Sequence, residues 1–164
     1  DEDYILVTLH RPSNVDNLEG LNKILDICKS VSTKMIFPIH PRTRNSFANF
    51  GLLNDLNSIE KLEVIDPVGY FDMIELIKNC QLVITDSGGL QKEAFFFSKH
   101  CVTLRDETEW MELLEHGYNV LAGSDEDTIR FNIEKMLTKR SDFSIDLYGN
   151  GQASQVILQN LLKL

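Results

Sequence analysis

Short runs of apolar and β-branched residues recur along the chain, and a more polar stretch separates each run from the next. The runs cover residues 4–8, 34–39, 62–65, 82–85, 101–104 and 119–121. Such runs predict β-strands. The runs at 34–39 and 82–85 are apolar almost throughout instead of alternating with polar residues, which is typical of strands that helices cover on both faces.

The stretches between the runs carry helical periodicity. The clearest case has apolar residues at spacings of three and four, at Leu18, Leu21, Ile24, Leu25 and Cys28. Asp16 and Glu19 are a plausible capping pair for this helix. Further helices are expected near residues 44–57, 70–79, 89–98, 109–116, 125–139 and 152–163.

Regular alternation of strands and helices predicts an α/β fold with a doubly wound, Rossmann-like parallel sheet. The sequence has no internal repeat and no linker rich in Gly, Ser or Pro, so residues 1–164 are expected to form a single domain. In such sheets, ligands bind beyond the carboxyl ends of the strands, where loops meet helix N-termini. Candidate functional residues are therefore sought in those loops.

Composition narrows the class of protein. No apolar run approaches the roughly 18 residues of a membrane span, which excludes a transmembrane protein. The net charge of −9 has the wrong sign for a general nucleic-acid binder. Three widely spaced cysteines without a CxxC pair favour buried thiols and a reducing compartment, hence the cytoplasm. The acidic start, without Met or a signal sequence, suggests a piece of a longer chain or the loss of a leader.

Several basic residues are gathered despite the acidic balance. Arg11, Arg42, Arg44 and Arg105 all follow predicted strands, so an anion site is expected at one edge of the sheet. His10 and Arg11 come directly after the first strand and combine a group that transfers protons with one that binds phosphate. The alternative is a histidine that caps loop carbonyls beside a solvated arginine.

The second strand leads into a loop that two prolines hold rigid. This loop carries His40 and Arg42, which suit a fixed anion contact. Arg44 is a weaker candidate because it equally fits a solvated position in the first turn of the next helix. His40 and Arg42 are therefore the favoured candidates here.

The most specific pattern is a buried strand that runs into Ser87, Gly88 and Gly89 and then directly into a helix. Unpaired amides at a helix N-terminus favour negative charge, and glycines let a phosphate approach the backbone. Glu93 lies four residues after Gly89 on the same helical face, where a carboxylate can accept hydrogen bonds from a ribose diol. The alternative is an ordinary Ser cap and a solvated Glu.

Two further loops are candidates for the same edge. Arg105 is placed to reach a ligand, and Thr108 either caps the next helix or contacts the sugar of the ligand. Aromatic residues and exposed backbone around Phe71 suit a nucleobase, although burial of Phe71 in the core is the commoner role for such a residue. No cluster of His, Cys, Asp or Glu has zinc spacing, so neither a metal nor a cofactor is expected.

Together, these motifs resemble the C-terminal half of the non-hydrolysing UDP-N-acetylglucosamine 2-epimerase family. The matching motifs are His10-Arg11-x-x-Asn14, His40-Pro41-Arg42-Thr43, Asp86-Ser87-Gly88-Gly89-x-x-x-Glu93, Arg105-x-x-Thr108-Glu109 and Gly151-x-Ala153. The resemblance covers essentially the whole chain, and several motifs in the same order are more specific than any one of them.

The resemblance implies the C-terminal half of a GT-B architecture, which holds the UDP part of a UDP-sugar. Ser87, Gly88 and Gly89 would hold the diphosphate, Glu93 the ribose, and the backbone near Phe71 the uracil. His10 would lie beside the diphosphate and assist the chemistry. Arg11 and His40 match positions that, in bacterial relatives, also serve a second, regulatory UDP-sugar site.

The implied reaction is inversion at C2 of the sugar, by elimination of UDP to a 2-acetamidoglucal and its re-addition. The acid and base carboxylates would lie on an N-terminal domain that these 164 residues lack, so the chain alone is expected to be inactive. The full-length protein would act as a cytoplasmic homodimer in cell-envelope polysaccharide synthesis.

Two departures from the family pattern bear on the substrate. Ser13 stands where the family commonly has Glu, and Trp110-Met111 stands where it has Arg-Pro. The Thr-Glu-Trp variant is similar to relatives that act on other UDP-2-acetamido sugars, including diacetamido uronic acids. An epimerase for such a sugar is therefore one alternative, and a GT-B glycosyltransferase half is another. A nucleotide-sugar sensor without chemistry is a third.

Overall fold

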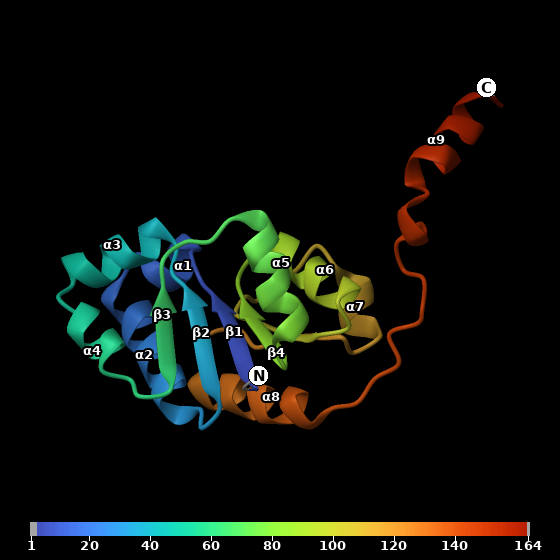
Figure 1. The fold of residues 1–164 in the computed structure, drawn as a ribbon. Helices are drawn as coiled ribbons and strands as arrows, with labels where there is room; N and C mark the ends of the chain where they lie inside the picture. The colour runs from blue at the N-terminus through green and yellow to red at the C-terminus, as the bar shows by residue number, and fades with distance from the viewer. Residues whose placement is uncertain (1–2, 164) are drawn as a thin grey trace.

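The six predicted strands pair side by side in one parallel sheet (Figure 1). In the computed structural model, which describes residues 3–163, the strand order is β3-β2-β1-β4-β5-β6. The strands are β1 (Tyr4–Thr8), β2 (Lys34–Pro38), β3 (Leu62–Ile65), β4 (Leu82–Thr85), β5 (His100–Thr103) and β6 (Asn119–Leu121). This order confirms the Rossmann-like fold.

The chain builds outward from β1 to β3 and then returns to place β4 against the other side of β1. Thr8 at the end of β1 pairs with Thr85 at the end of β4, and their hydroxyl oxygens lie 2.7 Å apart. The connections that follow these two strands leave in opposite directions, which opens a crevice at their carboxyl ends. The crevice lies beside the predicted His10 and Ser87 loops.

The helices occupy most of the predicted positions. They are α1 (Pro12–Val15), α2 (Leu18–Ser30), α3 (Pro41–Asn49), α4 (Leu53–Asn57), α5 (Tyr70–Asn79), α6 (Gly88–Phe96), α7 (Met111–Glu115), α8 (Glu126–Thr138) and α9 (Ala153–Leu161), with a short 3-10 turn at Gly149–Gly151. The short α1 was not predicted; Pro12 begins it, at a position where a proline loses no helical hydrogen bond.

Four local predictions are corrected. The helix expected at 44–57 is two helices, because Gly51 adopts a φ of +72° and ends the first. The strand expected at 101–104 begins one residue earlier, at His100, and the one expected at 34–39 ends at Pro38. Asp16 does not cap α2.

The cap of α2 is Asn17, whose side chain accepts a 2.8 Å hydrogen bond from the amide of Gly20. Asp16 instead pairs with Arg42, through oxygen–nitrogen distances of 2.8 and 2.6 Å. The prediction erred by one residue because Asp and Asn are both good N-cap residues and stand side by side in the sequence.

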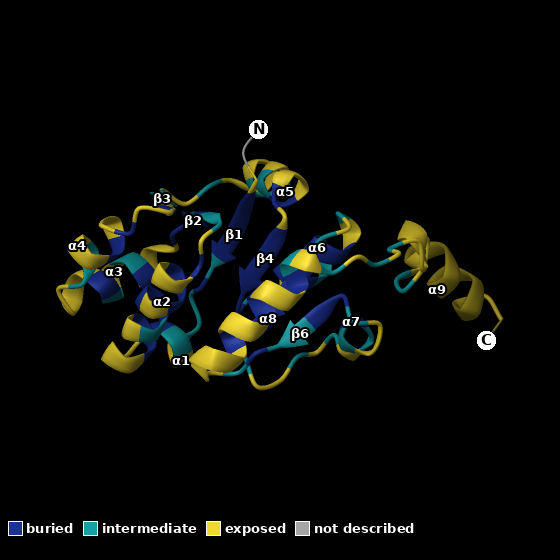
Figure 2. Ribbon diagram, turned by 90° about the horizontal axis from the view of Figure 1, so that it is seen from below, coloured by how far each residue is buried: buried dark blue, intermediate teal, exposed yellow. Residues whose placement is uncertain are grey.

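Helices cover both faces of the sheet, and the strands between them are largely buried (Figure 2). One apolar cluster packs α2 and α8 against the sheet, and a second packs α5 and α6 against the opposite face. Cys28, Cys80 and Cys101 are buried free thiols, as expected, and burial raises the pKa of Cys80 to about 11. None of the described helices has the length and hydropathy needed to cross a bilayer.

After α8 the chain runs without helix or strand over residues 139–148, here named the strap, and then enters α9, which projects away from the sheet (Figure 1). Aromatic side chains fasten the strap to the domain. Phe143 packs on Tyr118 with ring centroids 4.6 Å apart, and Tyr148 contacts Phe95 at 5.8 Å. Tyr118 also donates a 2.5 Å hydrogen bond to the carbonyl of Asp142. The strap is thus part of the packed domain, whereas the residues of α9 are exposed.

Glycine is expected to be favoured over alanine at Gly20, in the first turn of α2, although helices normally favour alanine by about 1 kcal/mol. A Cβ at this position would overlap the backbone carbonyl of Asn14 in α1, the helix that directly follows His10 and Arg11. Gly20→Ala should therefore lower the free energy of unfolding by about 1–3 kcal/mol, measured by urea denaturation. Gly69→Ala is the matched control, because a Cβ there meets only Asp72 Oδ2, at 3.5 Å. A stabilised Gly20→Ala protein would contradict this packing.

Candidate functional site

A fully buried carboxylate joins the two loops at the crevice. Asp86 follows β4 directly, and its oxygens accept hydrogen bonds from the backbone amides of His10 at 3.0 Å and Arg11 at 2.9 Å. The side-chain amide of Asn14 donates to the same carboxylate at 2.9 Å. The β1 loop is therefore held in place by a residue that follows β4.

Asp86 lies within one of the motifs that carry the family resemblance, but the sequence assigns it no role. The available signal was an acidic residue that directly follows an apolar strand. A carboxylate buried there needs several donors, and the three it receives come from one short segment, His10 to Asn14. The spacing of His10, Arg11 and Asn14 in the sequence reflects that need.

His10 and His40 lie next to each other across the ends of β1 and β2, with ring centroids 5.3 Å apart. His10 Nδ1 lies 3.3 Å from Asp86 Oδ1, and the side chain is 40% exposed. His40 uses Nδ1 to accept a 3.1 Å hydrogen bond from the amide of Arg42, so it caps α3. The His40 cap leaves Nε2 of its ring for other contacts.

Ser87, Gly88 and Gly89 form the turn that begins α6. Ser87 is the N-cap residue, yet its side chain makes no capping hydrogen bond to the helix. The amides of the first helical turn are thus free of that partner, and a helix N-terminus attracts anions. A Cβ at Gly89 would find open space beside the Ser87 hydroxyl, whereas one at Gly88 would overlap the Glu109 carboxylate.

A cavity of about 210 Å³, here named the Ser87 pocket, opens beside this turn. Its lining combines polar side chains from the carboxyl ends of the strands with an apolar wall. The lining includes Thr8, His10, His40, Pro67, Val68 and Ser87. The pocket therefore joins the β1, β2 and β4 loops to the segment that precedes α5.

Phe71 lies near the start of α5 and is 84% exposed, so the alternative that it packs in the core is wrong. Its ring meets that of Tyr70 edge to face, with centroids 5.9 Å apart. Phe71 does not line the Ser87 pocket itself, although Pro67 and Val68 of the same segment do.

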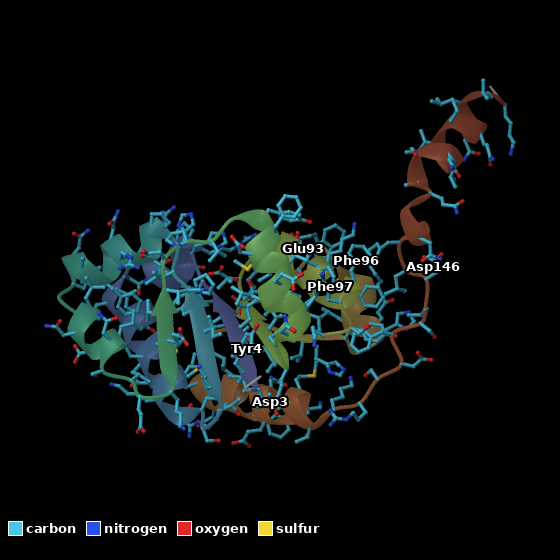
Figure 3. All side chains as sticks on the ribbon, viewed as in Figure 1. Asp3, Tyr4, Glu93, Phe96, Phe97 and Asp146 are labelled. Atoms are coloured by element: carbon cyan, nitrogen blue, oxygen red, sulfur yellow. The ribbon has the colours of Figure 1, made fainter. Side chains whose placement is uncertain are left out.

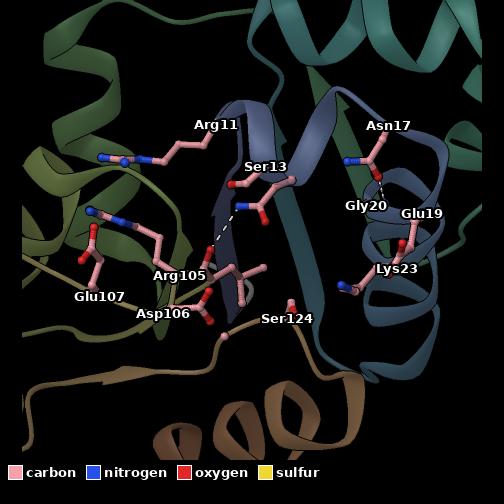
Figure 4. A pocket seen from close by; sticks show the side chains of 13 residues that line it. Arg11, Ser13, Asn17, Glu19, Gly20, Lys23, Arg105, Asp106, Glu107 and Ser124 are labelled. Carbon is pink, nitrogen blue, oxygen red and sulfur yellow. Dashed lines mark hydrogen bonds between the residues drawn. The ribbon is translucent and has the colours of Figure 1, made fainter.

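Arg11 and Arg105 lie side by side, and their guanidinium groups point in the same direction (Figure 4). Arg11 Nε donates to the carbonyl of Asp86 at 2.8 Å, and Arg105 Nη1 donates to Glu109 at 2.9 Å. The amide of Glu109 itself, followed by Arg105 and Arg11, lowers the pKa of the Glu109 carboxyl. The two arginines also line a cavity of about 550 Å³ that extends toward Lys23 and Ser124.

Glu93 lies one turn into α6 (Figure 3), and its partial burial raises the pKa of its carboxyl. Arg42 is exposed and forms a forked pair with Asp16, so less of its charge is available for a ligand. Thr108 donates a 2.6 Å hydrogen bond to Gln91 Oε1 and accepts one from the amide of Trp110. Arg42 and Thr108 thus both form contacts within the chain.

Arg44, the weaker candidate, lies in the first turn of α3 and pairs with Asp66 at 2.7 Å. Over residues 3–163, no group of three His, Cys, Asp or Glu side chains has an arrangement that could hold a metal ion.

Comparison with known proteins places these features in a family. The family model for UDP-N-acetylglucosamine 2-epimerase matches residues 1–162. A UDP-N-acetylglucosamine 2-epimerase from Methanococcus maripaludis is 43% identical over 162 residues, which cover 96% of this chain and 44% of the relative. A UDP-2,3-diacetamido-2,3-dideoxy-D-glucuronate 2-epimerase from Pseudomonas aeruginosa is 44% identical, covering 98% of this chain and 45% of the relative.

The structural comparison agrees. The crystal structure of Methanocaldococcus jannaschii UDP-GlcNAc 2-epimerase in complex with UDP-GlcNAc and UDP superposes with a TM-score of 0.89 at 40% identity, over 99% of this chain and 46% of that one. The chain thus spans about half the length of its curated relatives. With the family model matched along nearly its whole length, it belongs to the UDP-N-acetylglucosamine 2-epimerase family.

Proposed function

We propose that this chain is the nucleotide-binding half of a UDP-sugar 2-epimerase and that the turn at Ser87, Gly88 and Gly89 binds the diphosphate of UDP. The observation that carries the proposal is the start of α6, which has two glycines and no capping side chain. It adjoins the crevice where ligands of doubly wound sheets bind. The free amides and the helix dipole suit a diphosphate.

The surrounding cations support the same assignment. Arg11 and Arg105 add two guanidinium groups at this edge, and His10 lies beside them against Asp86. Departure of UDP from the sugar leaves negative charge on the diphosphate, which amides and guanidinium groups stabilise. His10 is proposed to lie beside the diphosphate and to assist its departure, while His40, Arg42 and Thr108 are proposed as further contacts.

The nucleoside is proposed to extend along α6 and α5. Glu93 would accept hydrogen bonds from the ribose diol, as acidic residues do in dinucleotide folds. The uracil would lie by the backbone near Phe71, where Pro67 and Val68 wall the Ser87 pocket. The exposed ring of Phe71 is then free to contact the base.

The full reaction needs more than this chain. We propose that the longer protein has a GT-B architecture and inverts C2 of UDP-N-acetylglucosamine to give UDP-N-acetylmannosamine, by loss and re-addition of UDP. The group that moves the C2 proton would belong to a preceding domain, since the chain covers only 44% of the length of the Methanococcus maripaludis relative. A cytoplasmic homodimer that serves cell-envelope polysaccharide synthesis is part of the same proposal.

A second candidate substrate is a UDP-diacetamido uronic acid. The relative named for such a substrate is 44% identical to this chain, and Trp110 departs from the common family pattern in the way noted above. Mass spectrometry and NMR of the products that the full-length enzyme forms from each UDP-sugar would distinguish the two substrates.

Gly89→Ala separates binding from folding. Alanine is favoured in helices and has room at this position, so the melting temperature should be unchanged or higher. The added methyl group would occupy space beside the Ser87 hydroxyl, and UDP affinity measured by calorimetry should fall by about tenfold or more. An unchanged affinity, or a wild-type chain that gives no heat with UDP, would contradict the proposed site.

The affinity for UDP should depend on the protonation of Glu93. Burial raises the pKa of this carboxyl, so it takes up a proton at a higher pH than an exposed Glu does. Because only the ionised form accepts two hydrogen bonds from the ribose, affinity should fall as the pH drops through that raised pKa. Glu93→Gln should bind UDP more weakly at neutral pH and lack this step. A wild-type pH profile identical to that of Glu93→Gln would exclude the role.

Asp86→Asn should weaken both the fold and the site. The new amide would direct a donor at groups that already donate, so the free energy of unfolding should fall by about 2–4 kcal/mol, measured by urea denaturation. UDP affinity should fall as well, because the β1 loop loses its anchor. Asp66→Asn is the control, since that carboxylate is 89% exposed in its pair with Arg44. Equal effects of the two changes would refute the role given to Asp86.

A further inference from the structure

A lysine lies among three aromatic rings on the side of α6 that faces the strap. Lys92 Nζ lies 4.4 Å from the ring centroid of Tyr148 and 4.6 Å from that of Trp110, with Phe96 farther out at 5.9 Å. The rings of Trp110 and Tyr148 meet at 89° with centroids 6.0 Å apart. Phe96 of α6 and Asp146 of the strap, both labelled in Figure 3, line one cavity. The cation and the ring edges thus fix how Trp110 is oriented.

Trp110 contacts the turn proposed to hold the diphosphate. Its indole Nε1–H donates a 2.7 Å hydrogen bond to the carbonyl of Gly88. The neighbouring carbonyl, that of Ser87, accepts a 3.2 Å hydrogen bond from Gln91 Nε2. The Thr108 hydroxyl donates a hydrogen bond to the side-chain oxygen of Gln91 and accepts one from the backbone amide of Trp110. Hydrogen bonds that depend on Trp110 and its neighbour Thr108 therefore restrain the carbonyls of both Ser87 and Gly88.

Restraining these carbonyls also orients the amides of the turn. A peptide unit is planar, so the carbonyl of Ser87 shares a plane with the amide of Gly88, and the carbonyl of Gly88 shares one with the amide of Gly89. Gly88 and Gly89 begin α6, where a glycine without a Cβ holds its backbone conformation less strictly than other residues do. The contacts of Gln91 and Trp110 thus fix the direction of the two N–H groups proposed to face the diphosphate.

Tyr148 brings the strap into this arrangement by its ring. Its hydroxyl is buried, and this burial, followed by the nearby Glu112 carboxyl, raises the pKa of the phenol. Its ring, in contrast, touches Trp110, Phe95 and Phe96, with centroids 5.4 to 6.0 Å away. The contribution of Tyr148 is therefore packing against Trp110.

We propose that Trp110, packed against Lys92 and Tyr148, is a positioning residue that presets the diphosphate-binding turn and couples it to the C-terminal strap. The consequence for UDP rests on the function proposed above, whereas the restraint on Gly88 and Gly89 does not. The two are tested by separate measurements.

Trp110→Phe keeps an aromatic ring beside Lys92 but removes the N–H that reaches Gly88, together with part of the indole. The amide NMR signals of Gly88 and Gly89 should shift, and UDP should bind about fivefold more weakly, the effect expected for one lost hydrogen bond. Calorimetry well below the melting temperature measures the affinity. Signals and affinity that match the wild type would overturn the proposal. If Trp110→Phe does not fold, Lys92→Gln, which removes the cation alone, is measured in the same way.

The coupling to the strap is tested by Tyr148→Leu. The matched control is Phe143→Leu, because Phe143 also anchors the strap but its ring packs on Tyr118 instead of Trp110. Trp110 is the sole tryptophan of the chain, so its fluorescence reports its surroundings directly. Tyr148→Leu should shift that emission, move the Gly88 and Gly89 signals and weaken UDP binding about threefold. Phe143→Leu should lower the melting temperature with little change in these readouts, and Tyr148→Phe should restore the wild-type values.

The outcomes separate the two proposals. A wild-type chain that does not bind UDP would refute the proposed function, while the emission and the glycine signals would still decide whether Trp110 restrains the turn. Glycine signals that stay in place in both Trp110→Phe and Tyr148→Leu would refute the positioning role, even if UDP binds tightly.

Discussion

The carboxylate of Asp86 lies between the ends of β1 and β4, buried from water and surrounded by donors. A buried charge is costly unless hydrogen bonds replace its hydration, and here two backbone amides and the Asn14 side chain do so. Because those donors belong to the β1 loop, satisfying the charge also fixes where His10 and Arg11 stand. The remaining geometry of the site, including the approach of Arg105, is built around that fixed loop.

Charge in this chain is strongly uneven. The protein carries nine more acids than bases, yet two guanidinium groups are brought together at the crevice. The Glu109 carboxylate interacts with both guanidinium groups, and its negative charge offsets their mutual repulsion. Such an arrangement holds positive charge in place before any ligand arrives, which means that little reorganisation accompanies the binding of an anion.

The sequence predicts features whose cause is local. Apolar runs identified every strand, and the glycines after β4 marked the start of α6. Features that depend on distant partners were not predictable in the same way. Nothing in the pattern around Phe71 states that its ring is exposed, and nothing around Asp86 states that its donors come from a loop more than 70 residues earlier. Nothing around Asp16, which the sequence suggests as a helix cap, states that it pairs with Arg42.

The adjacency of β1 and β4 has a consequence for how the domain assembles. Thr8 and Thr85, which close this pair, are 77 residues apart. Closing a loop of this length costs chain entropy before the strand contacts form, and such long-range parallel pairing is intrinsically slow. The crevice exists only once β1 and β4 have paired, so any molecule that binds there binds only the folded domain. Its occupancy then stabilises the whole sheet by mass action, not merely the loops it touches.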